Sequence, residues 1–197
     1  MARLSVPPEV TSVKVILLGL NHELQWKDPT GHLREIVADR LRSASVDLVA
    51  EEATGLPTTV AQRVACEVNK PWINIDMSRA DRMLAGIDET LIARPDGPLL
   101  VFDPFEIIGS RLSYLPKEDG IRETEWLSRI FKQRAEVVLC LCGFIHIDPF
   151  AKKLEEKGCS VEQQSLTELP WFQDLYGRYS IVEENGERWV EIRNAQR

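Results

Sequence analysis

The sequence has 197 residues, of which 44% are hydrophobic and 28% charged, and its formal net charge at pH 7 is −7. These values are typical of one globular domain with a real core, so residues 1–197 are treated as a single domain. The acidic balance argues against a nucleic-acid or anionic-membrane partner, although a local basic patch could still bind phosphates. No apolar run approaches the roughly 20 residues that span a bilayer, and residues 1–10 lack a secretory apolar core. We therefore expect a cytoplasmic chain without a membrane partner.

The four cysteines, Cys66, Cys140, Cys142 and Cys159, contain no Cys-x-x-Cys pair. Cys140 and Cys142 lie on one face of an apolar strand. A zinc knuckle or a disulfide framework is therefore not expected, and we predict that these two thiols are buried and unbridged.

Apolar runs of strand length alternate along the chain with segments of 3.6-residue periodicity, a pattern typical of βαβ units around a parallel sheet. Strands are predicted at residues 13–18, 46–52 and 72–76. Helices are predicted at residues 33–41 and at residues 58–69. The second helix should stop before Pro71. Ser78 should cap a short helix that ends near Gly86.

In the second half, residues 95–102 predict a turn with a short strand, and Asp103 followed by Pro104 predicts a helix start. A longer helix is expected at 122–135, with Trp126, Leu127 and Ile130 facing inward. Residues 136–142 form the most apolar strand and are expected at the centre of the sheet. Asp148 with Pro149 predicts another helix start.

The C-terminal segment is expected to form a β-hairpin (179–192) around an Asn185–Gly186 type I′ turn. Its register pairs Glu183 with Arg188. One face would carry Tyr179, Ile181, Val190 and Ile192. We expect this appendage to extend the sheet or cover the core, so the predicted fold class is α/β, with a mostly parallel central sheet, helices on both faces and a C-terminal β-hairpin.

Two of the three histidines follow an apolar strand in the same local pattern. Gly19 precedes His22 by three residues, and Gly143 precedes His146 by the same spacing. In parallel α/β sheets, ligands bind beyond the carboxyl ends of the strands, where both histidines are predicted to lie. A single Gly-x-x-His is weak evidence, but two that each close a strand favour a shared site.

Carboxylates are expected at the same edge. The second strand ends in Glu51 and Glu52, and the third ends in Asp76, which Ser78 and Arg79 follow closely. Two neutral imidazoles and a carboxylate can form an open divalent-metal site, or a general base with its orienting partner. Arg79 or Arg82 could stabilise an oxyanion. The structural alternatives are strand-end charges for the glutamates, a helix cap for Asp76 and surface ion pairs for the arginines.

The ordered pattern resembles the TraB/Tiki and erythromycin-esterase-like (ChaN-like) superfamily, which includes a haem-binding branch. Members have a first strand that ends in Gly-x-x-His, a second that ends in Glu, and a late strand that ends in a second Gly-x-x-His before a helix. Alignment of "DLVAEE" with that pattern favours Glu52 over Glu51. Members often carry an Asp-Arg pair after the third strand, whereas Met77 follows Asp76 here, so Arg79 and Arg82 stay alternatives.

The resemblance implies a hydrolase that acts on an ester or amide-like bond of a small-molecule or peptide substrate. His22 and His146 would hold a divalent metal (Mn, Co, Fe or Zn) or position water, with Glu52 as the third ligand or the general base, and Arg79 would stabilise negative charge. An alternative is a non-enzymatic protein that holds haem or another small ligand through the same histidines. A third is a partner-binding domain with a degenerate site.

Overall fold

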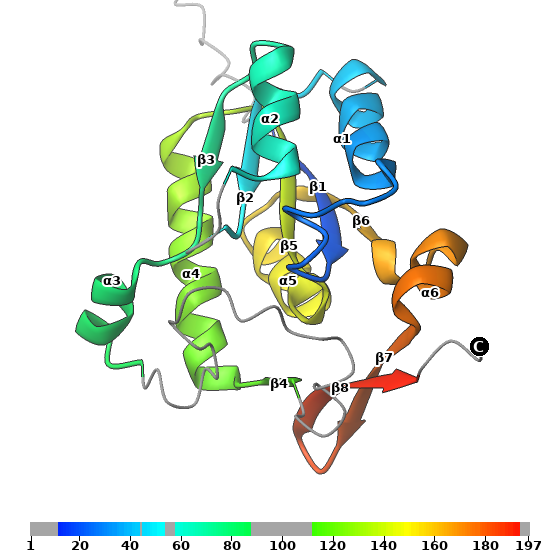
Figure 1. Ribbon diagram of the computed structural model, residues 1–197. Coiled ribbons are helices and arrows are strands. Elements are labelled where there is room, and N and C mark those ends of the chain that lie inside the picture. Colours follow the sequence, from blue (N-terminus) through cyan, green and yellow to red (C-terminus); the bar gives the residue numbers. More distant parts are fainter. Residues whose placement is uncertain (1–11, 44, 54–57, 88–111, 194–197) are drawn as a thin grey trace, which may run out of the picture.

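The computed structural model describes residues 12–43, 45–53, 58–87 and 112–193, which form an α/β fold with two sheets (Figure 1). In chain order the elements are β1 (Lys14–Leu20), α1 (His32–Ser43), β2 (Leu48–Glu51), α2 (Val60–Glu67), β3 (Trp72–Asn74), α3 (Arg79–Leu84), β4 (Leu112–Tyr114), α4 (Pro116–Lys132), β5 (Val137–Gly143), the 3-10 turn η1 (Phe144–His146), α5 (Ile147–Glu156), β6 (Ser160–Ser165), the 3-10 turn η2 (Leu166–Glu168), α6 (Pro170–Tyr176), β7 (Arg178–Glu184) and β8 (Glu187–Arg193). The predicted strand at 95–102 and the helix start at Asp103 lie outside the described residues.

The central sheet is parallel throughout, with the strand order β3-β2-β5-β1-β6. β5 is its middle strand, as the apolar sequence predicts, because neighbours on both edges and helices on both faces exclude water from it. β6 lies at the edge and has the polar sequence "SVEQQS". An edge strand needs no continuous apolar run, which explains why hydropathy does not mark it.

Helices pack on both faces of the central sheet, as expected (Figure 1). Alternate side chains of β1 and β5 point to opposite faces, so each strand contributes to two cores. On one face, Leu18 and Leu139 pack with α1 and α2. On the other, Leu17 and Cys140 pack with Trp126 of α4 and with α5. The apolar stripes of the helices determine this layering.

The hairpin has the predicted turn and register. Asn185 and Gly186 have φ values of 54° and 80°, as a type I′ turn requires, and Glu183 pairs with Arg188. The hairpin does not extend the central sheet. β8 instead pairs with β4 in a separate antiparallel sheet, and Val190 is buried against the core. Of the two expected roles, covering the core is the one observed.

Two predicted helix starts are wrong. Asp148 does not cap α5, because the η1 turn leads directly into a helix that begins one residue earlier, at Ile147. The Asp148 carboxylate instead accepts a hydrogen bond from Arg188 of β8. The longer helix, α4, begins at Pro116 rather than at Arg122, so Arg122 lies inside the helix.

Cys140 and Cys142 are buried and unbridged, as predicted. Burial raises the pKa of both thiols, because a thiolate in the apolar core has no water to solvate it. We therefore assign them a packing role. Among the described residues, no helix combines the length and hydropathy of a membrane span.

Candidate functional site

The two Gly-x-x-His motifs lie side by side at the carboxyl edge of the central sheet. β1 and β5 are adjacent parallel strands, and their register pairs Gly19 with Cys142 and Leu20 with Gly143. The polypeptide leaves the sheet at this edge after each of the two strands. After β1 it enters a turn in which Leu24 N–H donates to the backbone and side-chain oxygens of Asn21. β5 enters η1. The neighbouring strand ends therefore set the distance between the motifs.

A side chain on either motif glycine would collide with, or closely approach, residues in or next to the other motif. A Cβ atom on Gly19 would lie 1.9 Å from Ile147 Cδ1, in the helix that follows the second motif. A Cβ atom on Gly143 would lie 3.1 Å from His22 Nε2, 3.4 Å from Glu52 Oε2 and 3.4 Å from His146 Cδ2. The structure therefore brings His22, Glu52 and His146 together around the empty side of Gly143.

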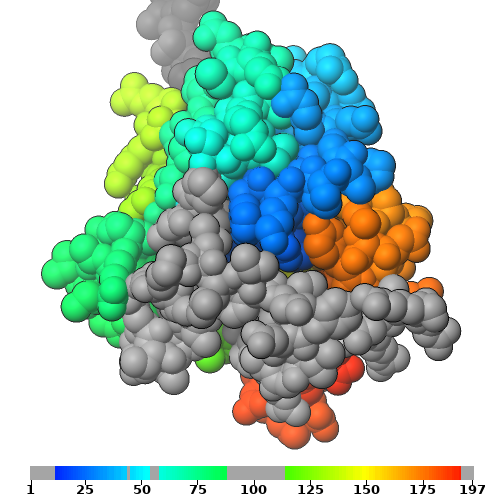
Figure 2. Space-filling model, viewed as in Figure 1, coloured from blue at the N-terminus to red at the C-terminus, as the bar shows by residue number. Residues whose placement is uncertain are grey.

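His22 is the accessible member of this group, with 35% of its side chain exposed. Figure 2 shows the segment that follows β1, coloured blue, at the surface of the molecule. The His22 ring makes a 2.7 Å hydrogen bond between Nδ1 and Gln25 Oε1, and its Nε2 lies 3.6 Å from Glu52 Oε1. One ring nitrogen is thus oriented by a buried amide, while the other faces a carboxylate.

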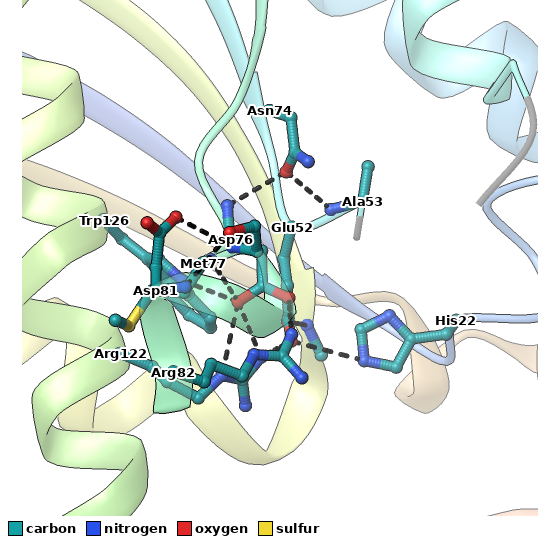
Figure 3. A network of polar contacts seen from close by, with 12 residues as sticks. His22, Glu52, Ala53, Asn74, Asp76, Met77, Asp81, Arg82, Arg122 and Trp126 are labelled. Atoms are coloured by element: carbon teal, nitrogen blue, oxygen red, sulfur yellow. Dashed lines mark hydrogen bonds and ion pairs between the residues drawn. The ribbon is translucent and has the colours of Figure 1, made fainter. Parts of the chain in front are cut away.

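Glu52 is buried at the end of β2, where Gly143 N–H donates to its Oε2 at 2.8 Å and Arg122 Nη2 donates to its Oε1. The ionised carboxylate accepts both bonds. His22 approaches Glu52 from the side opposite Asp76 (Figure 3). Glu52 is therefore a fixed anion next to the accessible imidazole.

Arg122 of α4 joins three buried carboxylates. It donates to Asp76 Oδ1 through Nε and Nη2 at 3.2 and 3.0 Å, to Asp119 Oδ1 through Nη1 at 3.0 Å, and to Glu52. Burial opposes the guanidinium charge, but Glu52, Asp76 and Asp119 outweigh it and raise the pKa of Arg122. Arg122 therefore stays charged and holds the network together.

Asp76 anchors the other end of this network. Its carboxylate also accepts hydrogen bonds from Arg82 Nη2 at 2.6 Å, Trp126 Nε1 at 3.2 Å and its neighbour Met77 N–H at 2.9 Å. Ser78, rather than Asp76, caps α3, as predicted for Ser78. Arg82 is therefore buried in an ion pair rather than on the surface, whereas Arg79 is exposed at the start of α3.

His146 occupies a different environment from His22, since it is only 4% exposed. Its Nδ1 lies 3.0 Å from Glu123 Oε1, and its Nε2 lies 4.0 Å from Asp119 Oδ1. Glu123 also accepts hydrogen bonds or ion pairs from Tyr114 OH and Lys153 Nζ. The ring packs edge-on against Trp126. His146 is thus built into the wall of the site.

Glu51 has a different set of hydrogen-bond partners from Glu52, because successive side chains of a strand point to opposite faces. Thr59 Oγ1 and Trp72 Nε1 donate to its Oε2 at 2.5 and 2.8 Å, and Gln25 Nε2 donates to its Oε1 at 3.1 Å. Burial raises the pKa of Glu51 to about 7, although these three donors oppose the shift. Glu51 therefore reaches His22 only through Gln25.

Sequence reasoning did not select Gln25, Asp119, Arg122 or Glu123. The three charged residues share the buried face of α4 with Trp126 and Ile130. Their spacing is the signal that could have identified them, because charged side chains on the apolar stripe of a helix need buried partners. Gln25 gives no comparable signal, since it lies in an irregular turn.

The three-ligand metal site expected from the sequence does not match this donor geometry. Glu52 already accepts from a guanidinium and a backbone N–H, and His146 presents Cδ2 rather than Nε2 toward Gly143. Within the ranges that the structure describes, no three His, Cys, Asp or Glu side chains are arranged to hold a metal ion. Among the described residues, the His22 Nε2 atom, which would be the axial ligand of a haem, faces the Glu52 carboxylate at 3.6 Å.

Comparison with known proteins gives no relative: no protein family, curated protein or solved structure matches the chain.

Proposed function

We propose that this protein is a hydrolase in which His22 activates water for attack on an ester or amide-like bond. The observation that supports this most is the pairing of an accessible imidazole with a buried, fixed carboxylate, His22 Nε2 and Glu52 Oε1 at 3.6 Å. The order of the two Gly-x-x-His motifs and the strand-end glutamate, which resembles the TraB/Tiki and erythromycin-esterase-like superfamily, favours the same reaction class. The substrate would be a small molecule or a peptide.

In this mechanism, His22 Nε2 accepts a proton from water as the water oxygen attacks the carbonyl carbon. The imidazolium that forms is stabilised by the Glu52 carboxylate. Arg122 and Gly143 N–H hold that carboxylate in place, so it needs no rearrangement during the reaction. The His22 proton then passes to the leaving group as the tetrahedral intermediate collapses. No step uses a metal.

The role of stabilising the developing oxyanion stays a prediction for Arg79. Arg79 is exposed at the start of α3, where its guanidinium is accessible to a ligand from solvent. An Arg79→Ala variant that retains wild-type turnover would remove this residue from the mechanism.

The test is hydrolysis of a panel of p-nitrophenyl esters and chromogenic peptides by protein without a polyhistidine tag. His22→Ala should lower kcat by at least about a hundredfold, the usual effect of losing a general base. His32→Ala is the matched control, because His32 is a partly exposed histidine on α1 that contacts Trp171 rather than Glu52. Equal turnover in both variants would contradict the proposal.

Chelation separates the two forms of the reaction that the sequence left open. Turnover that survives exhaustive treatment with EDTA supports direct activation of water by His22. Turnover that is lost on chelation and restored by Mn, Co, Fe or Zn would support the metal-assisted form instead. An absorbance band from haem added to the protein, if it disappears in His22→Ala, would favour the ligand-binding alternative.

A further inference from the structure

A buried hydrogen-bonded chain runs from Glu51 through Gln25 to His22. Gln25 is fully buried, and its Nε2 lies 3.1 Å from Glu51 Oε1 and 2.9 Å from the backbone carbonyl oxygen of Glu52. Its Oε1 lies 2.7 Å from His22 Nδ1. The Gln25 backbone is also held, because its carbonyl accepts a hydrogen bond from Val60 N–H at 2.7 Å.

The orientation of the Gln25 amide follows from its neighbours. A backbone carbonyl oxygen can only accept hydrogen bonds, so the Gln25 atom beside the Glu52 carbonyl must be the NH₂ group. The Glu51 carboxylate accepts the second N–H of the same group. A flipped amide would place its oxygen against both acceptors and lose both hydrogen bonds. Glu51 and the Glu52 backbone thus fix the direction in which Gln25 Oε1 points.

This orientation determines the tautomer of His22. Because Gln25 Oε1 is an acceptor, the Nδ1 atom of His22 must carry a hydrogen and donate it. A neutral imidazole has one N–H group, so its lone pair is then on Nε2, the nitrogen nearest Gly143 and Glu52. The other tautomer would point an N–H group at Glu52 and have no basic nitrogen there.

We propose that Gln25, oriented by Glu51 and the Glu52 backbone, is a positioning residue that holds His22 in the Nδ1–H tautomer with Nε2 as the base. The catalytic part of this inference rests on the hydrolase function proposed above. The tautomer itself does not, because it follows from hydrogen-bond donors and acceptors alone. Glu51 thereby acts on His22 without contacting it.

The first experiment is ¹⁵N-edited NMR of the imidazole side chains in the full chain at alkaline pH, where imidazoles are neutral. The sequence contains three histidines. Each of the variants His22→Gln, His32→Gln and His146→Gln removes the imidazole signals of one histidine and so assigns them. The proposal expects a protonated Nδ1 and an unprotonated Nε2 in His22. A spectrum with Nε2 protonated in the wild-type protein overturns it, and this measurement needs no variant of Gln25.

The second experiment changes the orienting residue. Gln25→Met removes the acceptor at similar length, and Gln25→Asn serves as a second variant, since its shorter amide cannot make both sets of contacts. Either variant should shift the His22 pattern toward the Nε2–H tautomer and lower kcat about tenfold or more, with KM nearly unchanged. Gln133→Met is the matched control, since Gln133 is an exposed glutamine at the C-terminal end of α4. A folded Gln25 variant that keeps the Nδ1–H pattern overturns the proposal.

The two proposals fail in different ways. If the His22 tautomer depends on Gln25 but no ester or peptide is hydrolysed, the positioning role stands and the hydrolase function fails. If hydrolysis depends on His22 while its tautomer is the same with and without Gln25, the positioning role fails and the hydrolase function stands.

Discussion

The Nε2 atom of His22 lies 3.1 Å from the point that a Cβ atom on Gly143 would occupy. This separation is shorter than an ordinary van der Waals contact, so the place of the imidazole depends on the absence of a side chain at Gly143. The backbone angles of Gly143, φ −55° and ψ 132°, are open to any residue. Space beside the His22 ring, rather than backbone conformation, therefore requires glycine here.

Gly143→Ala should displace the His22 ring by a few tenths of an ångström while leaving the fold intact. We expect turnover to fall about tenfold to a hundredfold, because small misplacements of a reacting group are costly. Gly120→Ala is the control: in α4 its added Cβ would lie an ordinary 3.6 Å from Lys153 Nζ. That variant should keep full activity and gain about 0.5–1 kcal/mol in stability. Kinetic assays and urea unfolding of both variants provide the comparison.

Gly19→Ala should instead damage the fold. Its added Cβ would lie 1.9 Å from Ile147 Cδ1, an overlap that we expect to cost about 1–3 kcal/mol of unfolding free energy. A double-mutant cycle with Ile147→Ala checks the cause, because removing Cδ1 and Cγ1 relieves the overlap. The Gly19→Ala penalty should shrink by about 1 kcal/mol or more in that background. An equal penalty in both backgrounds would assign the cost to something other than Ile147.

Glu51 should make stability depend on pH. Burial raises its pKa from 4.5 to about 7, so between these values the folded protein keeps a proton that the unfolded chain has lost. Its contribution to the free energy of unfolding is therefore greatest below pH 4.5 and is lost as pH rises through 7, by about 3 kcal/mol in all.

Glu51→Gln isolates this effect, since glutamine cannot ionise and all other titrating groups are common to both proteins. The unfolding free energy of the variant minus that of the wild type should rise by about 3 kcal/mol between pH 4.5 and pH 8. Urea denaturation at several pH values measures the difference. A difference that is constant with pH would show that burial does not raise the pKa of Glu51.

Arg122 should be essential to the fold. Arg122→Met leaves Glu52, Asp76 and Asp119 without their shared cation, and loss of one partner from a buried ion pair typically costs about 3–5 kcal/mol. Arg34→Met is the control, because Arg34 pairs with Glu67 on the surface, where each side chain is about half exposed. That variant should unfold at nearly the wild-type temperature, because water screens an exposed ion pair. Thermal unfolding of both variants separates the two cases.

His146→Ala should differ from His22→Ala in stability. The buried His146 ring contacts Glu123 and packs on Trp126, so its removal should lower the unfolding free energy by about 1–3 kcal/mol. His22 is one-third exposed, and its removal should change the melting temperature little. The shared Gly-x-x-His pattern in the sequence does not distinguish the two histidines. Equal melting temperatures for the two variants would contradict the different environments that the structure gives them.

The sequence by itself determined the layered α/β fold and the edge at which the site lies. Alternating apolar runs and amphipathic segments allow few arrangements other than a parallel sheet between helices. In such a sheet all carboxyl ends share one edge, so residues that closely follow strands, such as His22, Glu52 and His146, are expected at that edge. This inference needs only the direction of the strands.

Only the tertiary structure decided which residues contact His22 and which residues hold those contacts in place. Glu51 and Glu52 point to opposite faces of β2, and their sequence does not say which face His22 approaches. Arg122 comes from a helix 70 residues beyond Glu52, and its burial depends on how α4 packs against the sheet. Gln25 acts through the direction of one amide, which two acceptors fix. Such features depend on contacts between distant segments, and local patterns of hydropathy carry no information about them.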